Sequence, residues 1–212
     1  MSVHSILNNL NISRKRVRSK YYPKKIEGQE QEHINEFYKK LEKYKYDKTI
    51  CLDETLIYLN MVLPYGRSKK GTRVIKKTNK YPFIRYNLLC AISANKVVGC
   101  ALYEKLKGGV KTQNILDFYD KFIKDKYKNH LIIMDNAVIH RSKLIKTKIE
   151  ETGNNLLYSV RYHPETNSIE EFFSQLGQLK HYIKLTIKDI IKNKIKKEHL
   201  TNYLKHSFRI YE

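Results

Sequence analysis

The sequence contains no tryptophan, only four prolines, and three cysteines among its 212 residues. An odd number of cysteines without a CxxC pair is a poor disulfide framework, so we expect Cys51, Cys90 and Cys100 to be buried free thiols in a reducing compartment. No segment reaches the roughly 18 consecutive apolar residues of a membrane helix, and the N-terminus lacks the apolar core of a signal peptide. These absences predict an intracellular protein that does not contact a membrane.

Acidic residues are also scarce. Aspartate and glutamate number 21 against 42 lysines and arginines, which gives a formal net charge of +21. Such a balance favours a polyanionic partner, most commonly nucleic acid. An AT-rich genome, which encodes much Lys, Asn, Ile and Tyr, is a second explanation that is compatible with the first. A chain of this length is typical of one main domain.

Apolar periodicity predicts an alternation of strands and helices. Residues 49–53 alternate, so Ile50 and Leu52 are expected on one sheet face and Cys51 and Asp53 on the other. Further strands are expected at 87–93 and 96–104, which form a hairpin, and at 131–134 and 155–158. Helices are expected over 29–43, from 112, over 142–152 and from about 167. This order predicts the α/β class, with a ribonuclease-H-like mixed sheet flanked by helices.

Three acids stand at positions suited to a shared site. Asp53 and Asp135 each end an apolar run, in TICLDET and IIMD, and Glu170 stands at the start of the last long helix. Hard divalent cations take oxygen ligands, so three convergent carboxylates suit a site for two Mg²⁺ or Mn²⁺ ions. Singly, each acid has a plainer interpretation: a surface aspartate, a turn residue, and a glutamate that favours a helix start.

Two motifs carry a family resemblance. DNAxxH at 135–140 is followed by YxPxxNxIE at 162–170, and the chain resembles the catalytic domain of mariner-type transposases and bacterial insertion-sequence transposases of the DDE superfamily. Weaker support comes from DET at 53–55 and from YGRSKKGTRV at 65–74. The resemblance implies a DNA transposase in which Asp53, Asp135 and Glu170 hold two ions. One ion would activate water or a DNA 3′-hydroxyl, and the other would stabilise the leaving oxygen.

Residues near the three acids are expected to support them. Asn136 and Asn167 are interpreted as residues that hold the carboxylates in place without binding the metal themselves. His140 is expected to contact a phosphate or to hold the Asp135 loop, and a histidine that merely caps the following helix is the alternative. We do not assign His140 as a metal ligand, because hard cations prefer oxygen.

The N-terminal part predicts a second unit. Residues 1–47 resemble a helix-turn-helix remnant, a basic linker and an amphipathic helix, and residues 48–212 the catalytic domain. A short helix that packs on its own catalytic domain is the alternative for the first segment. Two basic clusters are expected to contact the DNA backbone: Arg14, Lys15, Arg16, Arg18, Arg67, Lys69, Lys70 and Arg73.

The resemblance also implies partners and location. Double-stranded DNA, as terminal repeats and target, is the expected substrate, a homodimer the expected assembly, and the nucleus or nucleoid the expected place. Two departures from the family are the glycine at Gly177 within a helix and the absence of a longer upstream DNA-binding region. Both fit a degenerate or truncated copy, so a catalytically inactive DNA-binding protein derived from a transposase is the alternative function. A cellular nuclease acting on RNA–DNA hybrids is a third.

Overall fold

A mixed β-sheet lies at the centre of the computed structural model, which describes residues 28–58, 73, 85–104, 106, 108–182, 192 and 194–210. Five strands pair in the order β3-β2-β1-β4-β5. The antiparallel half joins β1 to β2 and β2 to β3, whereas β4 runs parallel to both β1 and β5. The strands are β1 (Thr49–Tyr58), β2 (Arg85–Ser93), β3 (Val97–Glu104), β4 (Leu131–Met134) and β5 (Asn155–Tyr158).

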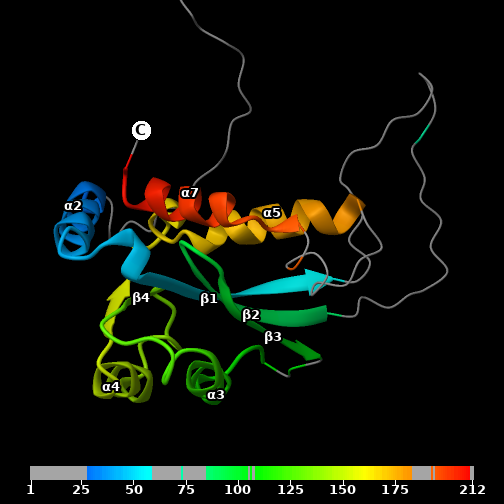
Figure 1. Ribbon diagram of the computed structural model, residues 1–212, viewed down its shortest axis with the longest axis horizontal. Coiled ribbons are helices and arrows are strands. Elements are labelled where there is room, and N and C mark those ends of the chain that lie inside the picture. Colours follow the sequence, from blue (N-terminus) through cyan, green and yellow to red (C-terminus); the bar gives the residue numbers. More distant parts are fainter. Residues whose placement is uncertain are drawn as a thin grey trace, which may run out of the picture.

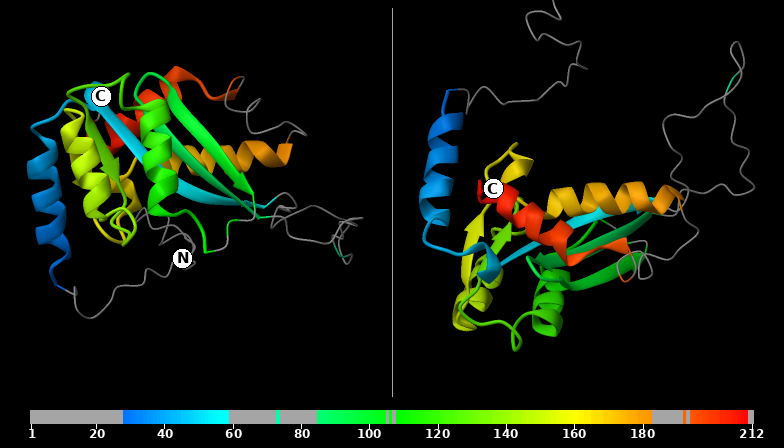
Figure 2. Two further views of the ribbon diagram at one scale, coloured as in Figure 1. Left: turned by 90° about the horizontal axis from the view of Figure 1, so that it is seen from below. Right: turned by 45° about the horizontal axis from the view of Figure 1, so that its top comes forward.

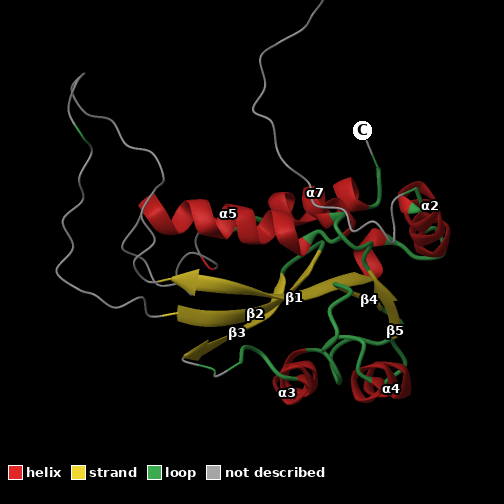
Figure 3. Ribbon diagram, turned by 180° about the vertical axis from the view of Figure 1, so that it is seen from behind, coloured by secondary structure: helices red, strands yellow, loops and turns green. Residues whose placement is uncertain are grey.

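Helices cover both faces of the sheet (Figures 1 and 3). On one face lie α3 (Thr112–Phe122) and α4 (Lys143–Glu151), and on the other α5 (Ile169–Tyr182) and α7 (Lys197–Ser207). Figure 2 shows α2 (Glu30–Leu41) at the end of the molecule that carries β5. Two short 3-10 helices are η2 (Tyr46–Lys48) and η3 (Pro164–Thr166). Within the described residues, none of the helices has the length and apolar character needed to cross a bilayer.

Strand alternation divides the core into two layers. Ile50 and Leu52 of β1 pack with α3 and α4, while Cys51 belongs to the layer beneath α5 and α7. The two largest fully buried side chains, Phe118 and Phe172, lie in opposite layers. Burying one such side chain contributes about 1.5–3 kcal/mol to the free energy of unfolding. The predicted facing of β1 is therefore confirmed, and it places Asp53 on the α5 side.

The order of strands and helices agrees with the prediction, but β1 is longer than its apolar run. It continues to Tyr58, so Asp53 lies within the strand rather than at its end. The reason is the pairing: β2 accompanies β1 from Ile50 to Tyr58, whereas β4 pairs only with residues 49–51. Beyond Cys51, one edge of β1 has therefore lost its strand neighbour.

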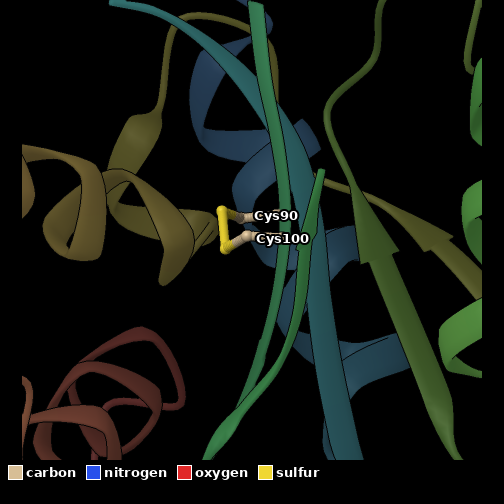
Figure 4. The surroundings of a disulfide bond; sticks show 2 residues. All are labelled: Cys90 and Cys100. Carbon is tan, nitrogen blue, oxygen red and sulfur yellow. A yellow bond between two sulfur atoms is a disulfide. The ribbon is translucent and has the colours of Figure 1, made fainter. Parts of the chain in front are cut away.

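The cysteines differ from the expectation of three free thiols. Cys90 and Cys100 form a disulfide between β2 and β3, and only Cys51 is a buried free thiol among the described residues. The two bonded residues are direct cross-strand partners, with Cα atoms 4.2 Å apart. Figure 4 shows the bond on the side of the sheet that belongs to the α5 layer. Cross-strand geometry, which the count of cysteines does not reveal, decides the pairing.

Candidate metal centre

Asp53 and Asp135 are brought side by side by the parallel pairing of β1 and β4. Cys51 is the register partner of Ile133, so two residues further along Asp53 comes level with Asp135, which directly follows β4. Asp53 is buried, with 5% of its surface exposed, whereas Asp135 is half-buried. The two carboxylates thus meet where β4 ends and leaves the edge of β1 open.

Backbone and side-chain donors hold each aspartate. The Glu54 N–H donates to Asp53 Oδ1 at 2.8 Å, and the Asn167 Nδ2 amide donates to Asp53 Oδ2 at 3.2 Å. Asp135 Oδ1 accepts from the Ala137 N–H at 3.0 Å and from Nδ1 of His140. Because these donors belong to three different segments, the carboxylates are fixed by the fold.

His140 is fully buried between two carboxylates. Its Nδ1 donates to Asp135 and its Nε2 to Glu54 Oε2, the latter at 2.9 Å. Burial acts to lower the pKa of this imidazole, but the hydrogen bonds to Asp135 and Glu54 outweigh it and raise the pKa to about 10. His140 is therefore a cation at neutral pH, and both ring nitrogens are occupied as donors.

The acids of the site repel one another. Burial first, and then the charges of Asp135 and Glu54, raise the pKa of Asp53 well above its ordinary value. Partial desolvation of the Glu170 carboxylate also raises its pKa, with the charge of Asp135 adding to it. For Asp135 burial acts upward, yet the hydrogen bonds from His140 and the Ala137 N–H prevail and lower its pKa. Crowded carboxylates of this kind favour a bound cation.

Glu170 faces the same pocket as Asp135, a hollow of 640 Å³. It stands in the first turn of α5 and is exposed. Within the described part of the chain, no hydrogen bond ties its carboxylate to its own helix, so the helix-capping interpretation has no support there. The other residues of this pocket are Asn136, Ala137, Val138, Arg141, Ser159, Val160, Arg161, Tyr162, His163, Pro164 and Asn167.

The donor set suits a hard cation. Ligand atoms of Asp53, Asp135 and His140 lie within 4.8 Å of one another, and Glu170, which lines the same pocket as Asp135, is outside this group. Since both nitrogens of His140 are hydrogen-bonded to carboxylates, the atoms that remain to ligate a cation are oxygens. One more is at hand: Asn167 Oδ1 is buried and has no hydrogen-bond partner among the described residues. Carboxylate and amide oxygens are the ligands that Mg²⁺ and Mn²⁺ prefer.

The residues predicted to contact DNA are described only in part. Arg73 is exposed. The other seven lie outside the described residues: Arg14, Lys15, Arg16, Arg18, Arg67, Lys69 and Lys70.

Sequence reasoning overlooked three residues at this site. Strand alternation places the Glu54 side chain on the opposite face of β1 from Asp53, and only the fold shows that His140 reaches it. Arg141 and Arg161 line the pocket, are exposed and take part in no ion pair in the described part of the chain. Adjacency to the DNAxxH and YxPxxNxIE motifs was the signal that could have found both arginines.

Comparison with known proteins agrees with this geometry. The sequence profile of a family described as DDE superfamily endonuclease matches residues 48–192. No curated protein sequence matches the chain.

Solved structures are similar in fold. A pre-cleavage Mos1 transpososome aligns with a TM-score of 0.73 at 13% identity, covering 98% of this chain and 67% of that one. A Mos1 mariner paired-end complex with Mn gives 0.75 at 12% identity, covering 98% and 67%. The catalytic domain of Mos1 mariner transposase gives 0.66 at 11% identity, covering 92% and 94%. The chain spans about two thirds of the longer Mos1 chains, and the predicted ribonuclease-H-like fold is confirmed.

Proposed function

The chain belongs to the DDE superfamily of endonucleases, and we propose that it is a metal-dependent DNA transposase that cuts and joins phosphodiester bonds. The observation that carries the proposal is the meeting of Asp53 and Asp135, from adjacent strands, beside a pocket that Asp135 and Glu170 both line. Acids of unrelated purpose would not be expected to converge in this way on a fold shared with a transposase.

Asp53, Asp135 and Glu170 would hold the ions, which we propose to be two Mg²⁺ or Mn²⁺. The unpartnered Oδ1 of Asn167 supports an ion near the aspartates. When bound, such ions supply positive charge to the attacking and leaving oxygens of a phosphodiester. Among the Mos1 structures, one paired-end complex contains Mn and another Mg.

The protein's own side chains would prepare this site. Asn167 fixes Asp53 and His140 fixes Asp135, so both aspartates are held before a cation arrives. Asn136 lines the pocket next to Asp135. Arg141 and Arg161, without acidic partners in the described structure, would bind phosphates of the DNA strand that enters the pocket.

The larger assembly is also part of the proposal. Solved Mos1 structures include paired-end and strand-transfer complexes of that protein. By analogy we propose double-stranded terminal repeats and target DNA as substrates, a homodimer as the working form, and the nucleus or nucleoid as the place of action. The division into residues 1–47 and 48–212 stays a prediction. In the structure, Phe37 and Leu41 of α2 pack into the same core as the sheet.

Cleavage of DNA that carries the element's own terminal repeats, to be sought in the genomic sequence on either side of the gene, tests the proposal. With Mn²⁺ or Mg²⁺ the wild-type chain should cut, and Asp53→Asn, Asp135→Asn and Glu170→Gln should not. Glu171→Gln is the matched control, because Glu171 neighbours Glu170 but pairs with His206 of α7 instead of facing the pocket. Equal cutting by wild type and Asp135→Asn would refute the assignment. Salt-sensitive DNA binding without metal binding or cutting would instead identify the inactive DNA-binding protein.

A further inference from the structure

Glu54 is linked to both aspartates of the candidate metal centre. Its backbone N–H donates to Asp53 Oδ1, and its carboxylate accepts from His140, whose other nitrogen donates to Asp135 Oδ1. Glu54 follows Asp53 in β1, and His140 lies in the loop after β4. A single residue therefore spans the two segments that supply the aspartates.

Both hydrogen-bond donors to the Asp135 carboxylate bind the same oxygen. The Ala137 N–H and His140 both donate to Oδ1, and within the described chain no hydrogen bond reaches Oδ2. Oδ2 is thereby left for a cation, provided that the carboxylate cannot rotate. The Ala137 N–H alone would permit rotation about its hydrogen bond, whereas a second donor on the same oxygen opposes it.

His140 can serve as that second donor only if its ring is held in place. The ring is fully buried, and its far nitrogen is bound by Glu54 Oε2 at 2.9 Å. An imidazole bound at both nitrogens cannot turn without losing both hydrogen bonds. Without Glu54, the buried Nε2–H would lose its acceptor, and the ring would be free to seek another.

We infer that Glu54 is a positioning residue of the metal centre, acting through His140 to orient Asp135. The inference rests on the proposed function and adds to it a residue that does not itself touch the ion. Loss of such an outer partner typically weakens metal affinity by roughly 10–100-fold.

Two conservative substitutions separate the effect of the length of the Glu54 side chain from the effect of its charge. Glu54→Asp keeps the charge but shortens the side chain by one methylene, so it no longer reaches His140. Glu54→Gln keeps the reach and an acceptor oxygen but removes the charge. Measured by calorimetric titration with Mn²⁺, affinity should fall at least roughly 10-fold in Glu54→Asp and stay within about threefold of wild type in Glu54→Gln. On DNA, Glu54→Asp should lower kcat and leave KM unchanged.

Double substitution tests the route through the histidine. If Glu54 acts only through His140, Glu54→Asp combined with His140→Ala should bind Mn²⁺ no more weakly than His140→Ala alone. Glu171→Asp, which shortens the other glutamate–histidine pair next to a proposed ligand, should bind as wild type does. Circular dichroism confirms that each variant is folded.

Two results would overturn the inference: wild-type affinity in Glu54→Asp, or losses that multiply in the double variant. Either leaves the proposed function standing, because wild type still binds and cuts. Failure of the wild-type chain to bind Mn²⁺ would instead overturn the proposed function and the inference together.

Discussion

Replacing Gly99 by alanine should destabilise the protein through a single contact. Gly99 lies on β3, where α3 crosses, and an added Cβ would stand 2.4 Å from Cδ1 and 2.5 Å from Cγ of Phe122. Cγ is the root of the ring, so a rotation of the ring tip gives no relief. Phe118, with its ring centroid 4.7 Å from that of Phe122, restricts the ring further. Overpacking of this kind costs about 1–3 kcal/mol.

Gly177→Ala is the matched control. Gly177 lies within α5, and an added Cβ there meets no atom within 4 Å. Neither glycine has a positive φ, so backbone strain does not contribute at either position. In a helix interior alanine is favoured over glycine by about 0.5–1 kcal/mol, so Gly177→Ala should stabilise the fold.

Urea denaturation followed by circular dichroism measures both effects. The midpoint should fall for Gly99→Ala and rise for Gly177→Ala, with the slope against denaturant unchanged in each. An unaltered midpoint for Gly99→Ala would refute the close approach of α3 to β3. A lowered midpoint for Gly177→Ala would show that α5 does not continue through this residue.

Three further predictions concern thiols, charge and metal. Burial raises the pKa of Cys51 to about 12, so a thiol reagent at pH 8 should find no reactive cysteine in the native protein. It should find one after unfolding, and three after unfolding with reductant, because Cys90 and Cys100 are bonded; three without reductant would disprove the disulfide. Arg141→Ala and Arg161→Ala should each reduce the salt dependence of DNA affinity by about one phosphate contact, seen as a shallower slope of log K against log salt; an unchanged slope would remove these arginines from the interface. Mn²⁺ at 100 times its dissociation constant should raise the free energy of unfolding by about 2.7 kcal/mol, a gain that Asp53→Asn or Asp135→Asn should abolish.

Much of the fold could be predicted because periodicity reports local structure. Alternation in TICLD predicts both the strand and the face on which Asp53 lies, and an unbroken apolar run predicts the buried parallel strand β4. Long-range register is different. A regular hairpin through Ala94 and Asn95 would set Cys90 opposite Gly99. The irregularity at Ala91 and Ile92 shifts the register by one residue and sets Cys90 opposite Cys100. Bulges of this kind have little sequence signal, so the disulfide was missed.

The site shows the same division between local and long-range information. Motif order predicts Asp53, Asp135 and Glu170 as a set. The Glu54–His140 contact joins residues 86 positions apart, and no pattern within either segment specifies it. Alternation even argues against it, because Glu54 and Asp53 leave β1 on opposite faces. The contact forms because the loop after β4 passes beyond the point where β4 stops pairing with β1, so that His140 of this loop reaches Glu54 while it contacts Asp135.

Glu170 is positioned by packing rather than by strand register, which decides how far Gly177 matters. Ile169, Phe172 and Leu176 form a buried stripe on α5, and all three precede Gly177. These three side chains pack the first two turns of the helix against the sheet, and Glu170 lies within those turns. The orientation of Glu170 therefore depends on residues that precede the glycine. Glycine at 177 therefore weakens only the later part of the helix. Gly177→Ala should raise stability and leave the affinity for Mn²⁺ unchanged, whereas Phe172→Ala should lower both, because it removes the contact that seats the first turns.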